Sequence, residues 1–292
     1  MVHELEKKAI KLRIMTLEMM RDSEASGHYG GSMSVMDILT TLYFGGIMRV
    51  SPVNPKWEER DRFILSKGHA CAALCPVLAE KGFFSPDILP TFNKLDSPFG
   101  MHPDMNKILG CDMSTGSLGH GTPIAAGMAM AGKYLKKDYR VYVVLSDGEV
   151  AEGSTWEAIE IISHFKLDNL CATIDRNKYS LDGPTEGPGI LGERGIEGTM
   201  TLEPIGKKLE IFGWHVIECD GHNFDQLLDA YEEAARVKGK PTMVIAHTVK
   251  GKEISFIEDK YEWHYGQFNS EQYRMALEEL NNKLKQLEQK SV

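Results

Sequence analysis

The sequence predicts an α/β protein, a single three-layer domain over residues 1–292 with a mostly parallel sheet and helices on both faces. Short apolar runs, of which Val-Tyr-Val-Val-Leu at 141–145 is the clearest, alternate with helical patterns. The connections are short, and no internal repeat or linker interrupts the alternation. Parallel strands joined by crossover helices have this pattern, and in such sheets ligands bind at the carboxyl ends of the strands.

The predicted elements follow one another from the N-terminus. Apolar residues recur at helical spacing over 4–21, and Ser34 with Asp37 resembles a capping box that would begin the next helix. Further helices are predicted over 38–44, 70–81, 122–136, 152–165, 205–212 and 224–237, and strands over 63–66, 141–145, 170–174, 214–218 and 241–246. The helix over 122–136 is rich in Ala, Gly and Met, so we expect it to pack closely against another helix or a partner chain.

The C-terminal segment, about 270–290, is predicted to be a helix. Leu277, Leu280, Leu284 and Leu287 follow one another at alternating spacings of three and four residues. Two interpretations remain open, a helix that docks on its own domain and a seam for a partner, and the first is preferred because the pattern spans barely two heptads.

The composition excludes several classes of protein. The chain has 33 Lys and Arg against 42 Asp and Glu, a formal net charge of −9. This balance argues against a nucleic-acid or anionic-membrane binder, which needs clustered positive charge. The N-terminus lacks the apolar segment of a secretory signal, and the longest uncharged stretch, 113–132, is rich in polar residues and Gly. We therefore expect a cytoplasmic protein with no membrane span.

The five cysteines are widely spaced, and only Cys71 and Cys75 are close in sequence. No further thiol or imidazole follows at metal-ligand spacing, so we interpret them as small buried residues of a protein in a reducing compartment. Glycine is more informative. The chain has 28 glycines, and they fall in short clusters where the backbone must turn sharply or approach a ligand closely.

Two polar motifs follow neighbouring predicted strands. Ser-Asp-Gly-Glu at 146–149 ends one strand, and Asp-Arg-Asn-Lys-Tyr at 175–179 ends the next. The Asp147 carboxylate and the Asn177 amide oxygen, one strand–helix–strand unit apart, can together hold a hard divalent cation. Gly148 would let the backbone approach a diphosphate, whose charge the following helix N-terminus favours. The alternative is a pair of ordinary turns, but their joint placement favours metal–diphosphate binding.

Four histidines lie in predicted turns, most of them beside glycine. They are His28, His69, His102 and His120. Imidazoles that converge on a cleft can bind hydroxyl or phosphate groups and move protons near pH 7. A catalytic zinc is the competing interpretation, and it is weak because no two of these histidines have ligand spacing.

Several motifs, in order, resemble the N-terminal section of transketolase, in the form where the enzyme is split into two polypeptides. They are Ser-Gly-His-Tyr-Gly-Gly-Ser-Met-Ser at 26–34, Leu-Ser-Lys-Gly-His-Ala at 65–70, Gly-Met-His-Pro at 100–103, Thr-Gly-Ser-Leu-Gly at 115–119, Asp-Gly-Glu at 147–149, Glu-Gly at 152–153, Asp-Arg-Asn at 175–177 and Trp-His at 263–264. The resemblance covers nearly the whole chain, and it implies the thiamin diphosphate-binding fold of the diphosphate (PP) type.

The resemblance implies a cofactor site for thiamin diphosphate and Mg²⁺, with Ca²⁺ or Mn²⁺ as expected substitutes. The side chains of Asp147 and Asn177 and the carbonyl of Tyr179 would hold the metal. The implied cofactor contacts are the amides of Gly148 and Glu149, the side chains of Asn177, His69 and His264, the segment Gly116, Ser117 and Leu118, and Lys250 as a phosphate contact.

The resemblance also implies the groups that act on substrate. His28, His102 and His264 would meet the hydroxyls of a sugar and assist proton transfer during carbon–carbon cleavage, and Glu152 matches an acidic position that couples the cofactor sites of a dimer. The implied reaction moves a two-carbon glycolaldehyde (ketol) unit from a ketose to an aldose, either of them phosphorylated. Alternatives are a subunit of another thiamin-dependent carboligase or 2-oxo acid dehydrogenase, or a non-catalytic paralogue.

Three positions depart from the family's pattern. Ser146 stands where the thiamin fingerprint usually begins with Gly, but Asp147 is kept, so we expect Mg²⁺ binding to be kept as well. His120 stands where many transketolases have Gln, and Tyr265 separates His264 from Gly266. These two changes bear on the contacts with substrate.

The resemblance finally implies a partner. In transketolase the glutamate that activates the cofactor lies in a pyrimidine-binding domain, for which no second α/β pattern follows in this sequence. We therefore expect a C-terminal subunit that carries that domain, and a heterotetramer with two copies of each chain.

Overall fold

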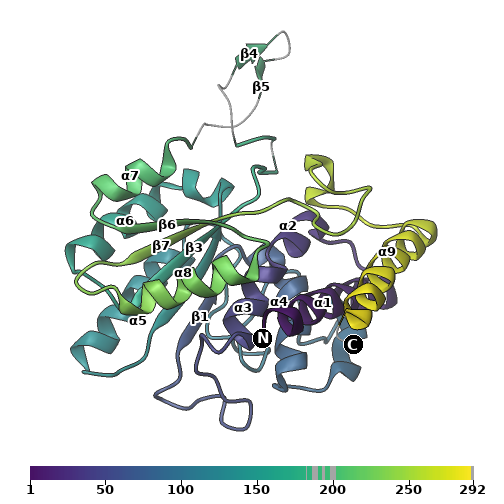
Figure 1. The fold of residues 1–292 in the computed structure, drawn as a ribbon, viewed down its shortest axis with the longest axis horizontal. Coiled ribbons are helices and arrows are strands. Elements are labelled where there is room, and N and C mark those ends of the chain that lie inside the picture. Colours follow the sequence, from purple (N-terminus) through teal and green to yellow (C-terminus); the bar gives the residue numbers. More distant parts are fainter. Residues whose placement is uncertain (182, 186–189, 193–194, 198–201, 291–292) are drawn as a thin grey trace.

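The computed structural model describes residues 1–181, 183–185, 190–192, 195–197 and 202–290, and its centre is a five-stranded parallel sheet (Figure 1). The strands lie in the order β1 (Arg62–Leu65), β2 (Val141–Ser146), β3 (Leu170–Arg176), β7 (Thr242–His247) and β6 (His215–Asp220). All of them run in one direction, so their carboxyl ends meet at one edge.

Alternate residues of each strand enter two separate cores. On β2, Val141 and Val143 pack with α5 (Gly121–Tyr134), α6 (Gly153–His164) and α7 (Ile205–Ile211). Tyr142 and Val144 pack in the other core, with α1 (Val2–Ser23), α3 (Met36–Phe44), α4 (Cys71–Lys81) and α8 (Phe224–Arg236). Because both faces are covered, the central strand β2 is a continuous apolar run rather than an alternating one. The predicted fold class is confirmed.

Short elements complete the fold. They are α2 (Tyr29–Ser34), the 3-10 helices η1 (Gly68–Ala70), η2 (Pro86–Thr91), η3 (Gly148–Ala151) and η4 (Tyr261–His264), and an antiparallel pair of strands, β4 (Ile190–Gly192) and β5 (Gly195–Glu197). The sequence did not predict β4 and β5. The helix predicted to begin at Glu152 is preceded by η3, which fills the turn after β2.

The predicted capping box at Ser34 and Asp37 is wrong. The helix α3 begins after Val35, and no side chain caps it. Ser34 Oγ instead donates to Asp175 Oδ2 at 2.7 Å, and the Asp37 carboxylate pairs with Arg13. The motif has the right local spacing, but tertiary partners from distant segments take both side chains.

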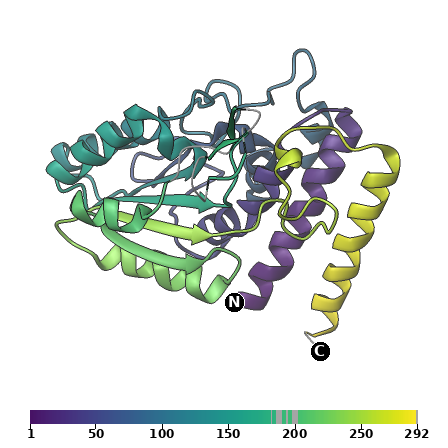
Figure 2. The ribbon, with the colours of Figure 1, turned by 90° about the horizontal axis from the view of Figure 1, so that it is seen from above.

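The C-terminal helix α9 (Ser270–Gln289) lies alongside α1 (Figure 2). Asn269 caps it in a capping box with Gln272. Its buried residues, Tyr273, Ala276, Leu280 and Leu287, belong to the same core as α1 and α3. Of the two interpretations of this segment, the helix that docks on its own domain is therefore confirmed.

The structure also shows the state of the cysteines and the character of the helices. The five cysteines are free thiols, and Cys71 and Cys75 lie on one face of α4 with their sulfur atoms 3.7 Å apart. Within the described residues, no helix is long and apolar enough to cross a membrane.

We predict that Leu280→Ala lowers the free energy of unfolding by about 2–5 kcal/mol, because a fully buried leucine is replaced by a cavity. The exposed Lys285 on the same helix supplies the control, for which Lys285→Ala should change the free energy by less than about 0.5 kcal/mol. Urea denaturation of the isolated chain measures both. Equal midpoints for the two variants would show that α9 does not contribute to the folded chain.

Candidate functional site

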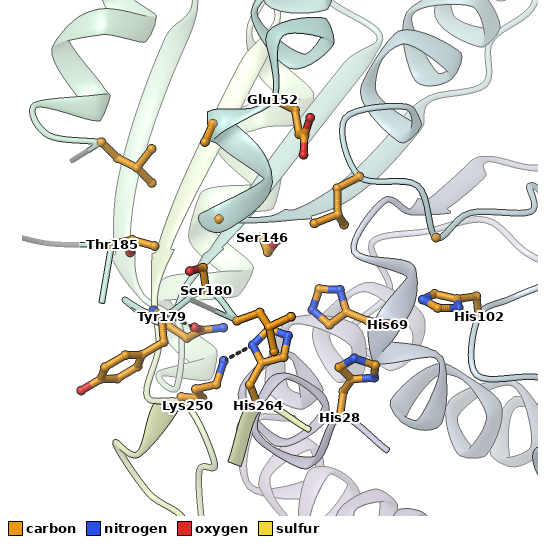
Figure 3. A pocket seen from close by; sticks show the side chains of 17 residues that line it. His28, His69, His102, Ser146, Glu152, Tyr179, Ser180, Thr185, Lys250 and His264 are labelled. Atoms are coloured by element: carbon orange, nitrogen blue, oxygen red, sulfur yellow. Dashed lines mark hydrogen bonds between the residues drawn. The ribbon is translucent and has the colours of Figure 1, made fainter. Parts of the chain in front are cut away.

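A cavity of about 630 Å³ opens at the carboxyl ends of the strands. The loops after β1, β2, β3 and β7 line it, together with the segment before α2 and the turn at η4 (Figure 3). Its lining residues are His28, His69, His102, Gly116, Leu118, Ser146, Gly148, Ala151, Glu152, Asn177, Tyr179, Ser180, Leu181, Thr185, Leu202, Lys250 and His264. Most of the site residues predicted from the sequence are among them.

Asn177 lines one end of this cavity, and Asp147 is buried directly behind that lining. Ser146 pairs with Asp175 in the register of β2 and β3, so the two residues emerge from neighbouring strand ends. Asp147 is fully buried, and Asn177 is nearly so. The Asp147 carboxylate accepts from the amides of Gly148 at 2.9 Å and Lys178 at 2.6 Å, while Asn177 Oδ1 accepts from the Tyr179 amide at 3.2 Å.

This set of oxygen atoms fits a hard divalent cation. Burial raises the pKa of Asp147, and the nearby Arg176 guanidinium only partly opposes this. A bound cation would favour the ionised carboxylate, and carboxylate, amide and backbone carbonyl oxygens are the ligands that Mg²⁺ and Ca²⁺ prefer. Asp147, Asn177 and the carbonyl of Tyr179 are the groups available for this task.

Four imidazoles lie together at the other end of the cavity. The ring of His28 lies 5.1 Å from that of His69, 5.4 Å from His264 and 6.3 Å from His102, measured between ring centroids. His69 and His264 are also 5.4 Å apart. The structure thus brings together three of the four loop histidines that the sequence singled out, and His264, which the resemblance also implied, lies with them. The fourth, His120, is exposed at the start of α5 and does not line the cavity.

Burial and positive charge keep these imidazoles neutral at pH 7. Burial, with His102 and the ammonium groups of Lys250 and Lys67, lowers the pKa of His28 to about 4. Burial and the Lys250 ammonium lower the pKa of His264 to about 3. The pKa of His69 lies well below its usual value for the same reasons. Neutral rings can accept a proton or a hydrogen bond from a substrate hydroxyl.

Lys250 lies between the two ends of the cavity. Its Nζ atom is 3.1 Å from His264 Nδ1 (Figure 3), and burial lowers the pKa of Lys250 to about 8. Glu152 lines the rim and is exposed. Ser117 is exposed outside the lining, and Glu149 is buried below it, where its carboxylate accepts from Ser66 Oγ and, at 2.9 Å, from the Gly119 amide.

Two of the three departures from the family's pattern lie at the cavity or beside it. Ser146 lines the cavity, and its hydroxyl accepts from the Glu149 amide at 3.3 Å. Tyr265 packs its ring edge-on against His28 at 5.0 Å, while the adjacent Gly266 pairs with Gly27 through two backbone hydrogen bonds. The extra residue therefore places an aromatic ring beside the imidazole cluster, and His264 still reaches the cavity.

Two buried cations beside the cavity were not predicted from the sequence. Arg176 Nη1 contacts Asp147 Oδ2 at 3.1 Å, and its Nη2 donates to Glu203 at 2.8 Å. Lys67 is fully buried and pairs with Asp175 at 2.5 Å. The sequence signal was weak: each lies inside a motif, Asp-Arg-Asn or Ser-Lys-Gly-His, at the carboxyl end of a strand.

The glycine clusters meet at the site. A Cβ atom on Gly68 would fall 2.8 Å from the backbone nitrogen of Gly116. Gly116 itself has φ +151°, and a Cβ atom there would fall 2.9 Å from the His102 ring. The loops after β1 and before α5 can approach this closely only because these positions lack side chains. The backbone of 115–118 is thereby brought to the cavity.

The fold and the cavity define a parallel α/β protein with a polar cavity, lined by histidines and Lys250, at its strand ends. The chain matches the family described as "Transketolase, thiamine diphosphate binding domain" over residues 5–283. It belongs to this family. Thiamin diphosphate is therefore the cofactor that the family supports, and the homologues are transferases.

The chain is also similar to individual transketolase proteins. The chain is 38% identical over 290 residues to a protein of Phocaeicola vulgatus that is named as one subunit of an apulose-4-phosphate transketolase, covering 99% of this chain and 98% of that protein. It is 40% identical over 277 residues to the 6-deoxy-6-sulfo-D-fructose transketolase subunit SqwG of Clostridium sp. (strain MSTE9), with 95% and 96% covered. The crystal structure of transketolase from Campylobacter jejuni superposes with a TM-score of 0.84 at 29% identity, and covers 95% of this chain but 42% of that one. The chain thus resembles a whole subunit of the split proteins and less than half of the longer enzyme.

We predict that the imidazole cluster makes the chain less stable in mild acid. Because the folded pKa of His28 is about 4 and its unfolded pKa is about 6.5, the unfolded state binds more protons between these values. The free energy of unfolding should therefore fall as the pH falls from about 6.5 to 4, and this contribution should be lost in His28→Gln. Urea titrations of both proteins across pH 4–7.5 measure it, and parallel curves for the two would contradict it.

Proposed function

We propose that this chain is the diphosphate-binding subunit of a two-chain transketolase, which moves a two-carbon ketol unit from a ketose to an aldose. The observation that carries the proposal is the shared cavity, with Asn177 at one end, Asp147 buried behind it, and the cluster of His28, His69, His102 and His264 at the other end. One end suits a metal-bound diphosphate, and the other suits a polyhydroxylated substrate.

At the first end, Asp147, Asn177 and the Tyr179 carbonyl would hold Mg²⁺, or Ca²⁺ or Mn²⁺ in its place. Lys250, whose ammonium reaches the cavity between the two ends, would contact the diphosphate. Gly148, whose position leaves room for a close approach of the backbone, lies beside it. His69, Glu149 and the segment 116–118 are the other proposed contacts. Thiamin diphosphate, when bound, supplies the electron sink for carbon–carbon cleavage.

At the second end, His28 and His102 would meet the sugar hydroxyls, with His264 beside them. His28 Nδ1 is buried and has no hydrogen-bond partner within the described part of the chain. A buried polar atom of this kind costs free energy unless a partner fills the site, which supports a role in binding a hydroxyl donor. Because its ring is neutral, His28 can take a proton from that hydroxyl and return it.

A partner chain completes the proposal. The chain is similar along its length to proteins named as subunits of split transketolases, and covers only 42% of a single-chain enzyme. We propose that the partner carries the pyrimidine-binding domain and its activating glutamate, and that two copies of each chain assemble. Glu152, at the exposed rim, would face the assembly.

The substrate is proposed to be a sugar with an anionic group. The relatives are named for apulose-4-phosphate and for 6-deoxy-6-sulfo-D-fructose, which carry a phosphate and a sulfonate. We therefore propose a ketose phosphate, or a similarly charged ketose, as donor and an aldose or aldose phosphate as acceptor.

We predict that substitutions at the two ends of the cavity affect different quantities, cofactor affinity at one end and kcat at the other. In the complex with the partner, Asp147→Ala should weaken Mg²⁺-dependent binding of thiamin diphosphate by roughly 100-fold or more, because a metal ligand is lost. His28→Ala should bind the cofactor within about threefold of the wild type and lower kcat by about 10²- to 10⁴-fold, the usual contribution of a proton-transfer group. Calorimetric titration and turnover with a panel of ketoses measure the two quantities.

The exposed Asp229 on α8 supplies the control, since Asp229→Ala removes a carboxylate far from the strand ends. Full activity of the Asp147→Ala complex would show that the metal assignment is wrong. If the wild-type complex takes up no cofactor, the enzymatic proposal fails altogether.

A further inference from the structure

A buried chain of hydrogen bonds lies outside the cavity and uses none of its lining residues. Arg13, from α1, donates to both oxygens of Asp37, from α3, at 2.8 Å each. His222, in the loop after β6, places its Nδ1 atom 2.7 Å from Asp37 Oδ2. The Val249 amide then donates to His222 Nε2 at 2.8 Å. The hydrogen bonds therefore join four segments that are distant in the sequence.

The two partners of His222 define its protonation. Because the Val249 amide donates to Nε2, that nitrogen carries no proton, and the single ring proton lies on Nδ1, where it is donated to Asp37. The ring is neutral, and its orientation is fixed from both sides. Its side chain is only 12% exposed, so solvent competes little for either hydrogen bond.

Asp37 is a fixed anion in this network. Burial acts to raise the pKa of its carboxyl, but the Arg13 guanidinium and the hydrogen bond from His222 hold that pKa well below its usual range. Arg13 Nη2 also donates to the carbonyl of Met33 at 2.9 Å. Carboxylates often orient a metal-bound or catalytic histidine by accepting a hydrogen bond from its ring. Asp37 orients His222 in the same way, although His222 does not line the cavity.

Both ends of the network hold segments that carry cavity residues. Met33 lies in α2, which directly follows His28. Val249 directly precedes Lys250, and the Gly251 amide donates to the carbonyl of Gly30 at 3.0 Å. A Cβ atom on Gly30 would fall 2.8 Å from Lys250 Cγ, so the two segments are in close contact. A shift of Val249 would move the ammonium of Lys250 within the cavity.

We propose that His222 is a positioning residue, which holds the backbone at Val249 through its Nε2 atom and thereby sets the place of Lys250 at the diphosphate end of the cavity. The part of this inference that concerns the cofactor rests on the proposed function. The part that concerns the backbone of 249–251 does not.

The size of the effect follows from the surroundings of the segment. Thr248 Oγ1 donates separately to Asp175, so loss of His222 leaves the neighbouring residue anchored. Outer hydrogen-bond partners of metal ligands typically contribute 10- to 100-fold to affinity, and we expect the lower value here, about 10-fold. Turnover at saturating cofactor should change by less than about threefold, since His28 and His102 belong to other segments.

The experiment compares His222→Ala and His222→Gln with the control His215→Ala. The control removes a different histidine–carboxylate pair, in which His215 lies 2.6 Å from Glu233. Amide hydrogen exchange of the full chain without cofactor, read at Gly251, reports the backbone. Thiamin diphosphate titration with Mg²⁺, in the complex with the partner, reports the affinity, and kcat is measured at saturating cofactor.

We expect His222→Ala to speed exchange at Gly251 and to weaken cofactor binding about 10-fold with kcat nearly kept, whereas His215→Ala changes neither. His222→Gln, which can place an oxygen acceptor near Val249, should recover part of both losses, and it also serves if His222→Ala does not fold. Unchanged exchange overturns the positioning role, and faster exchange with unchanged affinity overturns its link to the cofactor. If the wild-type complex binds no cofactor, the proposed function fails, while the exchange result still tests the backbone.

Discussion

The site depends on one buried ion pair, that of Lys67 with Asp175. Both side chains are fully buried, and Lys67 Nζ lies 2.5 Å from Asp175 Oδ2. Burying such a pair costs free energy unless further hydrogen bonds satisfy its remaining lone pairs and N–H groups. Here Ser34 and Thr248 donate to the same carboxylate, and Lys67 also donates to the Gly31 carbonyl at 3.1 Å. These contacts join the ends of β1, β3 and β7 to α2. The strand ends that form the cavity are thus held by charge as well as by the sheet.

The same pair helps to set the electrostatics of the cavity. Lys67 and Lys250 lie close enough to the imidazoles to act on them, and Asp147, Glu149 and Asp175 are buried near the same space. The positive charge of the two ammonium groups, added to burial, lowers the pKa of His28 and of His264 and keeps both imidazoles neutral. It would also attract a polyanion such as a diphosphate. The same positive charges therefore act at both ends of the cavity. Within the described residues, no histidine of the cavity has a carboxylate partner that would oppose this effect.

Local patterns were enough to predict the sheet, its covering helices and the placement of Asp147 and Asn177 after neighbouring strands, because strand ends converge by topology alone. The glycine clusters likewise predicted that the backbone approaches closely at some positions, but not that Gly68 and Gly116 are the two that meet. Long-range partners could not be predicted. Ser34 and Asp37 have the spacing of a capping box, but Asp175 and Arg13 compete for them and prevail, since a buried charge gains more from a charged partner than from a helix amide. Arg176 was missed for the same reason.

Two independent charged networks hold the same two segments, and this shapes what a single substitution can do. Lys67 and Asp175 hold Gly31, Ser34 and Thr248, whereas Arg13, Asp37 and His222 hold Met33 and Val249. The two sets alternate along the chain, so α2 and the segment before Lys250 are each fixed from two sides. Residues that share a network couple strongly, while residues in separate networks should add. Loss of His222 would then release Val249 while Arg13 still holds Met33 in the helix that follows His28, so binding at the diphosphate end would become separable from chemistry at the sugar end.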